Sequence, residues 1–319
     1  MANLGYIQVT RQCNQRCRFC SNPPVEGERT LEEARVLVDD LRSRGYHGVI
    51  LTGGEPTLVP DLPELVAYCR DVGFPVRLIT NGTRLRDERL LDRLLDSGLA
   101  HCHISLCSHR VEVQDELTRN PGGFAAVLEA LELLGSRQER IRVDVNITIN
   151  RMNADDLDSV VRMVIDRFPF VRHFVLNGLD PDTDRLREAP ELIPRLRDVE
   201  VSLAMAADAV MDSGRTLRVE RIPLCFMPGF EHCSTETRKI VKDEERTTHF
   251  LDLRGAVRQD AGAFVHRHHE VCEVCTLKPI CAGLYDREKG YDPAELAPQF
   301  IDPEEIRQRI MSRGSPETV

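Results

Sequence analysis

Three cysteines near the start of the chain, Cys13, Cys17 and Cys20, stand within a segment of eight residues. They directly follow a β-rich run, Tyr6–Thr10, so we expect them on a loop at the carboxyl end of the first strand, where α/β folds build active sites. Thiolates are the usual ligands of iron–sulfur clusters. Three of them leave one iron of a four-iron cluster open to a cofactor or substrate. The alternative is a structural zinc site without its fourth ligand, which the position at a strand end disfavours.

A second polar segment, Thr52–Thr57, reads Thr-Gly-Gly-Glu-Pro-Thr and ends the next β-rich run, Gly48–Thr52. Its glycines would let the backbone approach a ligand closely, and Glu55 could accept a hydrogen bond from an ammonium group. Two glycines alone indicate no more than a turn. Because this segment ends the strand after the cysteine loop, the two together are candidates for one site.

These two segments resemble the radical S-adenosylmethionine (SAM) superfamily, whose C-x-x-x-C-x-x-C motif has an aromatic residue, here Phe19, before its third cysteine. The resemblance extends from residue 6 to about residue 180. It implies a [4Fe–4S] cluster on the three cysteines, which chelates SAM and cleaves it reductively to a 5′-deoxyadenosyl radical. It also implies a segment that binds the SAM amino group, formed by Gly53, Gly54, Glu55 and Pro56.

Weaker matches suggest further SAM contacts. Ser105 resembles a fourth-strand serine that contacts SAM, and Arg119 resembles an arginine that reaches the SAM carboxylate. Asn146 resembles a ribose-contacting position on the fifth strand. Thr80 and Asn81 end the third strand and would line the same pocket. For each of these residues, the alternative is an ordinary strand end or helix cap.

The strand period also assigns a direction to Cys107. Alternate residues of a strand share a face, so if Ser105 faces the SAM pocket, Cys107 faces it too and Cys102 points away. A thiol at this place could donate a hydrogen atom to a substrate radical. The alternative is a small apolar packing residue.

A second cysteine group lies near the C-terminus, where Cys272, Cys275 and Cys281 give C-x2-C-x5-C. This spacing resembles the SPASM auxiliary-cluster module of radical SAM enzymes, although Tyr285 stands where that motif has its fourth cysteine. It is therefore similar to the shortened, one-cluster form called twitch. The implied ligands of an auxiliary [4Fe–4S] cluster are Cys225, Cys272, Cys275 and Cys281, with Cys233 in reserve. The alternative is structural zinc on these cysteines, with a histidine from the run 266–269.

The elements that must position these residues alternate between β-rich and amphipathic helical runs. The expected strands are 6–10, 48–52, 76–80, 101–107, 141–149 and 171–176, and the expected helices between them are 31–44, 62–72, 86–97, 124–134 and 155–168. This order predicts parallel βα units. We expect an α/β fold, a partial (β/α)6 barrel with its following helix over 1–215. A small loop-rich metal-cluster module follows over 216–292, and a C-terminal helix and tail over 293–319.

Composition limits the classes of partner. The chain has 319 residues and a formal charge of -10, which disfavours nucleic acid. No apolar run is long enough to cross a membrane, and no signal peptide is evident, so we expect a cytoplasmic protein without a membrane partner. Eleven cysteines in a reducing compartment indicate metal binding or catalysis rather than disulfides.

Together these features predict an enzyme that cleaves SAM and abstracts hydrogen from a substrate C–H bond, with two [4Fe–4S] clusters and SAM as cofactors. A low-potential donor such as flavodoxin or ferredoxin would reduce it. The first hypothesis for the substrate is a ribosomally synthesised peptide. The alternatives are oxidation or rearrangement of a small molecule in cofactor or natural-product biosynthesis, and a non-catalytic iron–sulfur or zinc protein, which the Gly-Gly-Glu segment disfavours.

Overall fold

Strands and helices alternate along the chain in the computed structural model, which describes residues 4–22, 27–244, 246–251, 256–259, 266–285 and 290–312. Seven strands up to residue 220 are all parallel to their neighbours. They are β1 (Leu4–Thr10), β2 (Gly48–Gly53), β3 (Val76–Thr80), β4 (His101–Ser105), β5 (Arg142–Thr148), β6 (His173–Asn177) and β7 (Thr216–Glu220).

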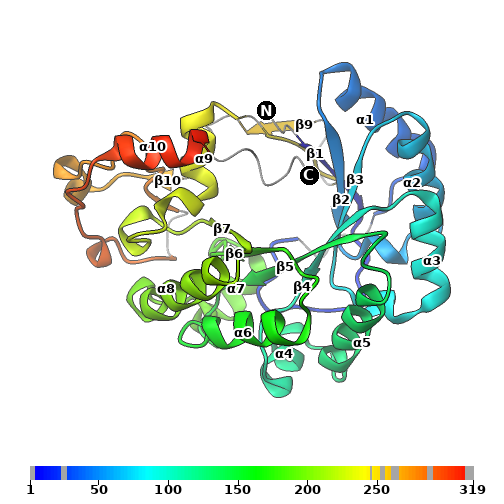
Figure 1. Ribbon diagram of the computed structural model, residues 1–319, viewed down its shortest axis with the longest axis horizontal. Coiled ribbons are helices and arrows are strands. Elements are labelled where there is room, and N and C mark those ends of the chain that lie inside the picture. The colour runs from blue at the N-terminus through cyan, green and yellow to red at the C-terminus, as the bar shows by residue number, and fades with distance from the viewer. Residues whose placement is uncertain are drawn as a thin grey trace.

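The sheet curls into an incomplete barrel, with its helices on the outside (Figure 1). Its strand order is β7-β6-β5-β4-β3-β2-β1-β8-β9, so neighbours in sequence are neighbours in space as far as β7. At the other edge, β8 (Arg246–His249) pairs parallel with β1, and β9 (Ala256–Gln259) pairs antiparallel with β8. The expected partial barrel is confirmed.

Two segments that the sequence analysis placed in the C-terminal module belong to this sheet. Residues 216–220, at the start of the expected module, form β7 and pair with β6, which extends the barrel beyond residue 215. The same module supplies β8 and β9 to the opposite edge. Strand pairing over so long a sequence separation leaves no local pattern, so the sequence did not indicate it.

Most of the helices pack on the outer face of the sheet, where they bury apolar side chains. Helix α1 begins after Thr30, whose side chain accepts a hydrogen bond from the backbone of Glu33 while the Glu33 carboxylate bonds back to Thr30, as a capping box does. The long helices are α1 (Leu31–Ser43), α2 (Leu62–Asp71), α3 (Glu88–Ser97), α4 (Val111–Thr118), α5 (Gly123–Gly135), α6 (Leu157–Arg167), α8 (Leu196–Asp212), α9 (Thr235–Lys242) and α10 (Pro303–Ser312). Helix α7 (Asp184–Glu188) is short.

The two faces of the strands differ in character. On β5, Val143, Val145 and Ile147 are fully buried in the core beneath the helices. The alternate residues of the same strand, among them Asp144 and Asn146, line a cavity on the inner side of the sheet. This period of two separates an apolar outer layer from a polar interior.

The C-terminal part of the described chain packs beside the open edge of the barrel, at the left of Figure 1. Helix α10 contacts α9, and a two-residue pairing joins β10 (His266–Arg267) to β11 (Leu284–Tyr285). Between these two strands lies a short helical turn, Glu270–Val274. Within the described residues, no helix has the length and apolar character needed to cross a membrane.

Candidate active site

The segment Cys13–Cys20 follows β1 and is attached to the last turn of α4. The backbone N–H of Arg16 donates to the carbonyl of Thr118 at 3.0 Å, and that of Arg18 donates to the carbonyl of Leu117 at 2.8 Å. The carbonyl groups that end a helix have no partners within it, so they are free to hold such a loop. Helix α4 was not predicted from the sequence, and it fixes the cysteine loop in place.

The three thiols of this loop line one cavity of about 500 Å³ on the inner side of the sheet. The backbone N–H of Gln15 lies 3.4 Å from Sγ of Cys13, and the Cys17 thiol lies 3.4 Å from the Gln15 side-chain oxygen. Burial raises the pKa of Cys17 well above its ordinary value. Three thiols converging on one cavity wall fit a cluster that takes three protein ligands.

The two glycines of the second motif allow the end of β2 to pack against the backbone that leads into the cysteine loop. Gly53 has a φ of +138°, and a Cβ there would lie 2.2 Å from the carbonyl oxygen of Thr10. A Cβ on Gly54 would lie 2.1 Å from the carbonyl oxygen of Gln12. Both glycines also line the cavity. Close packing within the chain therefore requires glycine at both positions, and their contact with a ligand stays a prediction.

Glu55 is fully buried beside residues that line the cavity, and its expected contact with the SAM ammonium group stays a prediction. Its Oε1 accepts hydrogen bonds from the backbone and hydroxyl of Thr57, at 3.0 and 2.6 Å, and from the hydroxyl of Thr80 at 2.6 Å. Its Oε2 accepts from the backbone N–H of Asn81 at 2.7 Å. Burial raises the pKa of this carboxyl, while these hydrogen bonds oppose the shift. The carboxylate thus joins the ends of β2 and β3.

The remaining motif residues divide into two groups. The structure brings Thr80, Asn81, Ser105 and Asn146 to the cavity, on the ends or inner faces of β3, β4 and β5. Pro56 is buried and is not among the residues that line the cavity. Arg119 is exposed at the end of α4, where its φ of 49° is left-handed, and it is not a cavity residue.

The direction expected for Cys107 is confirmed in its geometry. His103, Ser105 and Cys107 all line the cavity, whereas Cys102 is fully buried in the core beneath the helices. Burial raises the pKa of Cys107 to about 11, so the group keeps its proton at neutral pH. A hydrogen-atom donor needs an intact S–H bond, and this environment preserves it.

Charged residues on the inner wall were missed by the sequence analysis. Among the residues that the structure describes, six basic side chains line the cavity, together with four acidic ones. The basic residues are Arg77, Arg142, Arg218, Arg221, Arg238 and Lys239, and the acidic ones are Asp144, Asp180, Glu220 and Glu244. The available signal was the alternation of polar and apolar residues in Arg142–Thr148, which marks an inner face lined by polar groups.

The second cysteine group also converges. Cys225, Cys272, Cys275 and Cys281 line one small cavity whose other walls are largely apolar. A backbone N–H points at each of two sulfurs, from Gln299 to Cys275 and from Gly283 to Cys281, both at 3.3 Å. Such N–H···S contacts suit thiolate ligands of a metal centre. The four cysteines that the resemblance implied thus line one cavity, and their binding of a cluster stays a prediction.

Two other candidates of this region occupy different positions. Cys233 is 3% exposed within the hydrophobic core and does not line the small cavity. His268 does line it, with its Nε2 2.9 Å from the carbonyl oxygen of Cys281. Burial raises the pKa of Cys225 to about 12. A metal would therefore have to displace a firmly held proton from this thiol.

Comparison with known proteins agrees with this geometry. The profile of the radical SAM superfamily matches residues 7–164. An AdoMet-dependent heme synthase of Methanosarcina barkeri is 32% identical over 94% of this chain and 85% of its own length. The chain therefore belongs to the radical SAM superfamily, whose members are enzymes that use a [4Fe–4S] cluster and SAM.

Other relatives match over shorter stretches. An Fe-coproporphyrin III synthase of the same organism is 31% identical over 70% of this chain, which spans only 55% of that protein. A PqqA peptide cyclase of Bradyrhizobium diazoefficiens is 33% identical over 50% of this chain and 42% of its own length. In fold, the chain resembles SuiB of Streptococcus suis, with a TM-score of 0.63, 15% identity and coverage of 88% and 72% of the two chains.

Proposed function

We propose that this chain binds a [4Fe–4S] cluster through Cys13, Cys17 and Cys20, and SAM in the adjoining cavity. When bound, this pair supplies a 5′-deoxyadenosyl radical that abstracts hydrogen from a substrate C–H bond. Ser105 and Asn146 would contact SAM from the inner faces of β4 and β5, since both line the cavity. A low-potential flavodoxin or ferredoxin in the cytoplasm would supply the electron.

The substrate that the cavity fits best carries several carboxylates. The described lining of the cavity has six basic and four acidic side chains, an excess of two positive charges, in a chain with a formal charge of -10. Some of these charges neutralise one another, as Arg142 and Asp144 do at 3.2 Å. The remaining excess attracts anions into a protein that otherwise repels them. This contrast between cavity and whole chain is the observation that carries the proposal.

Among carboxylate-bearing substrates, we favour an iron tetrapyrrole over a peptide. The peptide cyclase aligns with half of this chain, whereas the heme synthase aligns with 94% of it. An alignment of that extent includes at least some of the basic residues that line the cavity from β7 and α9, namely Arg218, Arg238 and Lys239. This supports the small-molecule alternative above the peptide hypothesis that the sequence first suggested.

The second cysteine group would hold an auxiliary [4Fe–4S] cluster close to this substrate. Arg221 lines the main cavity and Cys225 lines the small one, so at most about 14 Å of extended chain separates the two positions. The Arg221 guanidinium also lies 5.3 Å from the ring of Tyr285, which stands on β11 beside the small cavity. An auxiliary cluster here would be placed to contact the substrate or to exchange an electron with it.

The test is substrate-dependent formation of 5′-deoxyadenosine. The anaerobically reconstituted enzyme receives SAM and dithionite, with Fe-coproporphyrin III, with its tetramethyl ester, or with the PqqA peptide. We expect the free acid to accelerate 5′-deoxyadenosine formation at least tenfold over the substrate-free rate and to be consumed, while the ester does neither. Mass spectrometry of the porphyrin follows the product.

Two variants connect this result to the cavity. Arg218→Gln should raise KM for the free acid, because it removes a cation from the cavity wall. Arg162→Gln is the matched control, since this residue is exposed on α6 with only an i,i+4 contact to Asp158. Equal rates with acid and ester would overturn the carboxylate proposal. Stimulation by the peptide alone would show that the substrate is a peptide.

A further inference from the structure

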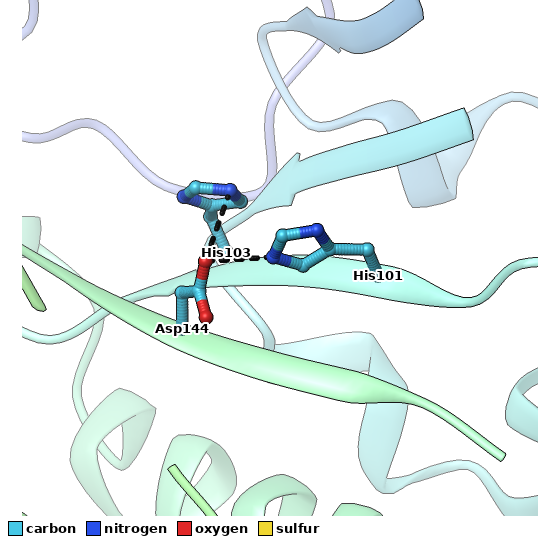
Figure 2. A group of neighbouring side chains, drawn as sticks. All are labelled: His101, His103 and Asp144. Atoms are coloured by element: carbon cyan, nitrogen blue, oxygen red, sulfur yellow. Dashed lines mark hydrogen bonds and ion pairs between the residues drawn. The ribbon is translucent and has the colours of Figure 1, made fainter. Parts of the chain in front are cut away.

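Two histidines and one aspartate bring their ligand atoms together on the inner side of the barrel (Figure 2). His101 and His103 share one face of β4, and the sheet register places Asp144 of β5 directly beside His103. One ligand atom of each residue lies within 4.8 Å of the other two. Oδ2 of Asp144 is 2.7 Å from Nε2 of His101 and 3.5 Å from Nε2 of His103.

The surroundings of the two histidines and the aspartate favour binding of a ligand. Arg142 donates from Nε to Oδ1 of Asp144 at 3.2 Å, so the other carboxylate oxygen is the one between the imidazoles. Nε2 of His103 is shielded from solvent and makes no hydrogen bond in the described part of the chain. A buried polar atom in that condition is unfavourable, and a bound group would relieve it.

We propose that His101, His103 and Asp144 bind a divalent transition-metal ion. Two imidazoles and one carboxylate are a known ligand set for iron(II), and nitrogen and oxygen donors also suit zinc. Ligand atoms about 2.0–2.2 Å from an ion stand roughly 3–3.5 Å apart. The two measured contacts are close to this spacing, so a small adjustment of side chains would admit the ion.

This site is separate from both cysteine groups. His103 precedes Ser105 by two residues, about 7 Å along the strand, on the side away from the cysteine loop. Because His103 and Asp144 line the main cavity, the ion would be accessible to a molecule bound there. The metal proposal needs neither SAM cleavage nor a tetrapyrrole substrate, and its test is independent of both.

Zinc is the probe for this site. The full chain, anaerobically reconstituted with its clusters, is equilibrated with Zn²⁺ and desalted, and zinc and iron per chain are measured by mass spectrometry. We expect one zinc per chain without loss of iron. His103→Gln and Asp144→Asn should each weaken zinc binding at least tenfold. X-ray absorption at the zinc edge should show nitrogen and oxygen ligands near 2.0–2.2 Å, and no sulfur, which would appear at about 2.3 Å.

The matched control is His249→Gln. His249 is also buried in the sheet and has one carboxylate neighbour, Asp40, at 3.6 Å, but it belongs to no three-ligand group in the described structure. This variant should retain its zinc. The proposal is overturned if the wild type binds no zinc, if its zinc has sulfur ligands, or if both test variants keep the wild-type zinc content. Should the test variants fail to fold, a wild-type melting temperature that zinc does not raise would also overturn it.

Discussion

Glu55 provides the sharpest test of how the Gly-Gly-Glu segment works. Its carboxylate is fully buried and accepts four hydrogen bonds from Thr57, Thr80 and Asn81. We therefore expect Glu55 to act by holding the ends of β2 and β3 in place. A residue that contacted SAM directly would affect the affinity for SAM, but would not by itself affect the stability of the chain without SAM.

The structure gives the size of the effect. In Glu55→Gln, the amide oxygen can keep the three donors at Oε1, but the amide nitrogen would face the N–H of Asn81, so one charge-assisted hydrogen bond is lost. This loss should lower the free energy of unfolding by about 1.5–3 kcal/mol. Glu55→Ala removes all four bonds and leaves four buried donors unsatisfied, at roughly 1–3 kcal/mol each, so it should cost at least about 4 kcal/mol.

The assay combines urea unfolding of the cluster-free chain, under anaerobic reducing conditions, with calorimetric SAM binding to the reconstituted enzyme. Thr57→Val is the informative companion, because Thr57 donates to Glu55 yet does not line the cavity. Both Glu55→Gln and Thr57→Val should lower stability and SAM affinity together. Glu64→Gln, an exposed change on α2, should alter neither. If Glu55→Gln lost SAM affinity at unchanged stability while Thr57→Val bound SAM normally, Glu55 would contact SAM directly and the positioning role would be refuted.

Three further outcomes are expected. The reconstituted wild type should contain about eight irons per chain, and the variant with alanine at all three cysteines of the first motif should contain about four. Zinc in place of the four irons expected at the second cysteine group would contradict the auxiliary-cluster proposal. Cys275→Ala should lower thermal stability and abolish substrate turnover, while 5′-deoxyadenosine formation without substrate persists, because metal-binding energy contributes to folding around the second site. Gly54→Ala should abolish SAM cleavage, since its Cβ would lie 2.1 Å from a carbonyl oxygen. Gly45→Ala places no described atom within 4 Å of the new Cβ, so it should keep SAM cleavage and lower the free energy of unfolding by about 1 kcal/mol because of its positive φ. Equal activities of the two variants would refute the packing role of Gly54.

Local patterns in the sequence were sufficient for much of this protein. The alternation of β-rich and amphipathic runs predicted the partial barrel. Strand β3 (Val76–Thr80) begins and ends where expected, and the other expected elements lie within two residues of their predicted bounds. The cysteine spacings selected two groups whose members converge in the structure. The period of two along β4 gave the direction of Cys107, because neighbouring residues of a strand must face opposite sides of the sheet.

Tertiary structure decided what depends on segments far apart in the chain. The pairing of β8 with β1 joins residues more than 200 positions apart, which no local period can encode. Glu55 lies inside the protein because Thr80 and Asn81, 25 and 26 residues later, bring their donors to its carboxylate. Likewise, His103 and Asp144 become neighbours only through the register of two parallel strands. The sequence determined which chemical groups are present and in what periods, whereas strand register and burial determined which of them meet and which face the cavity.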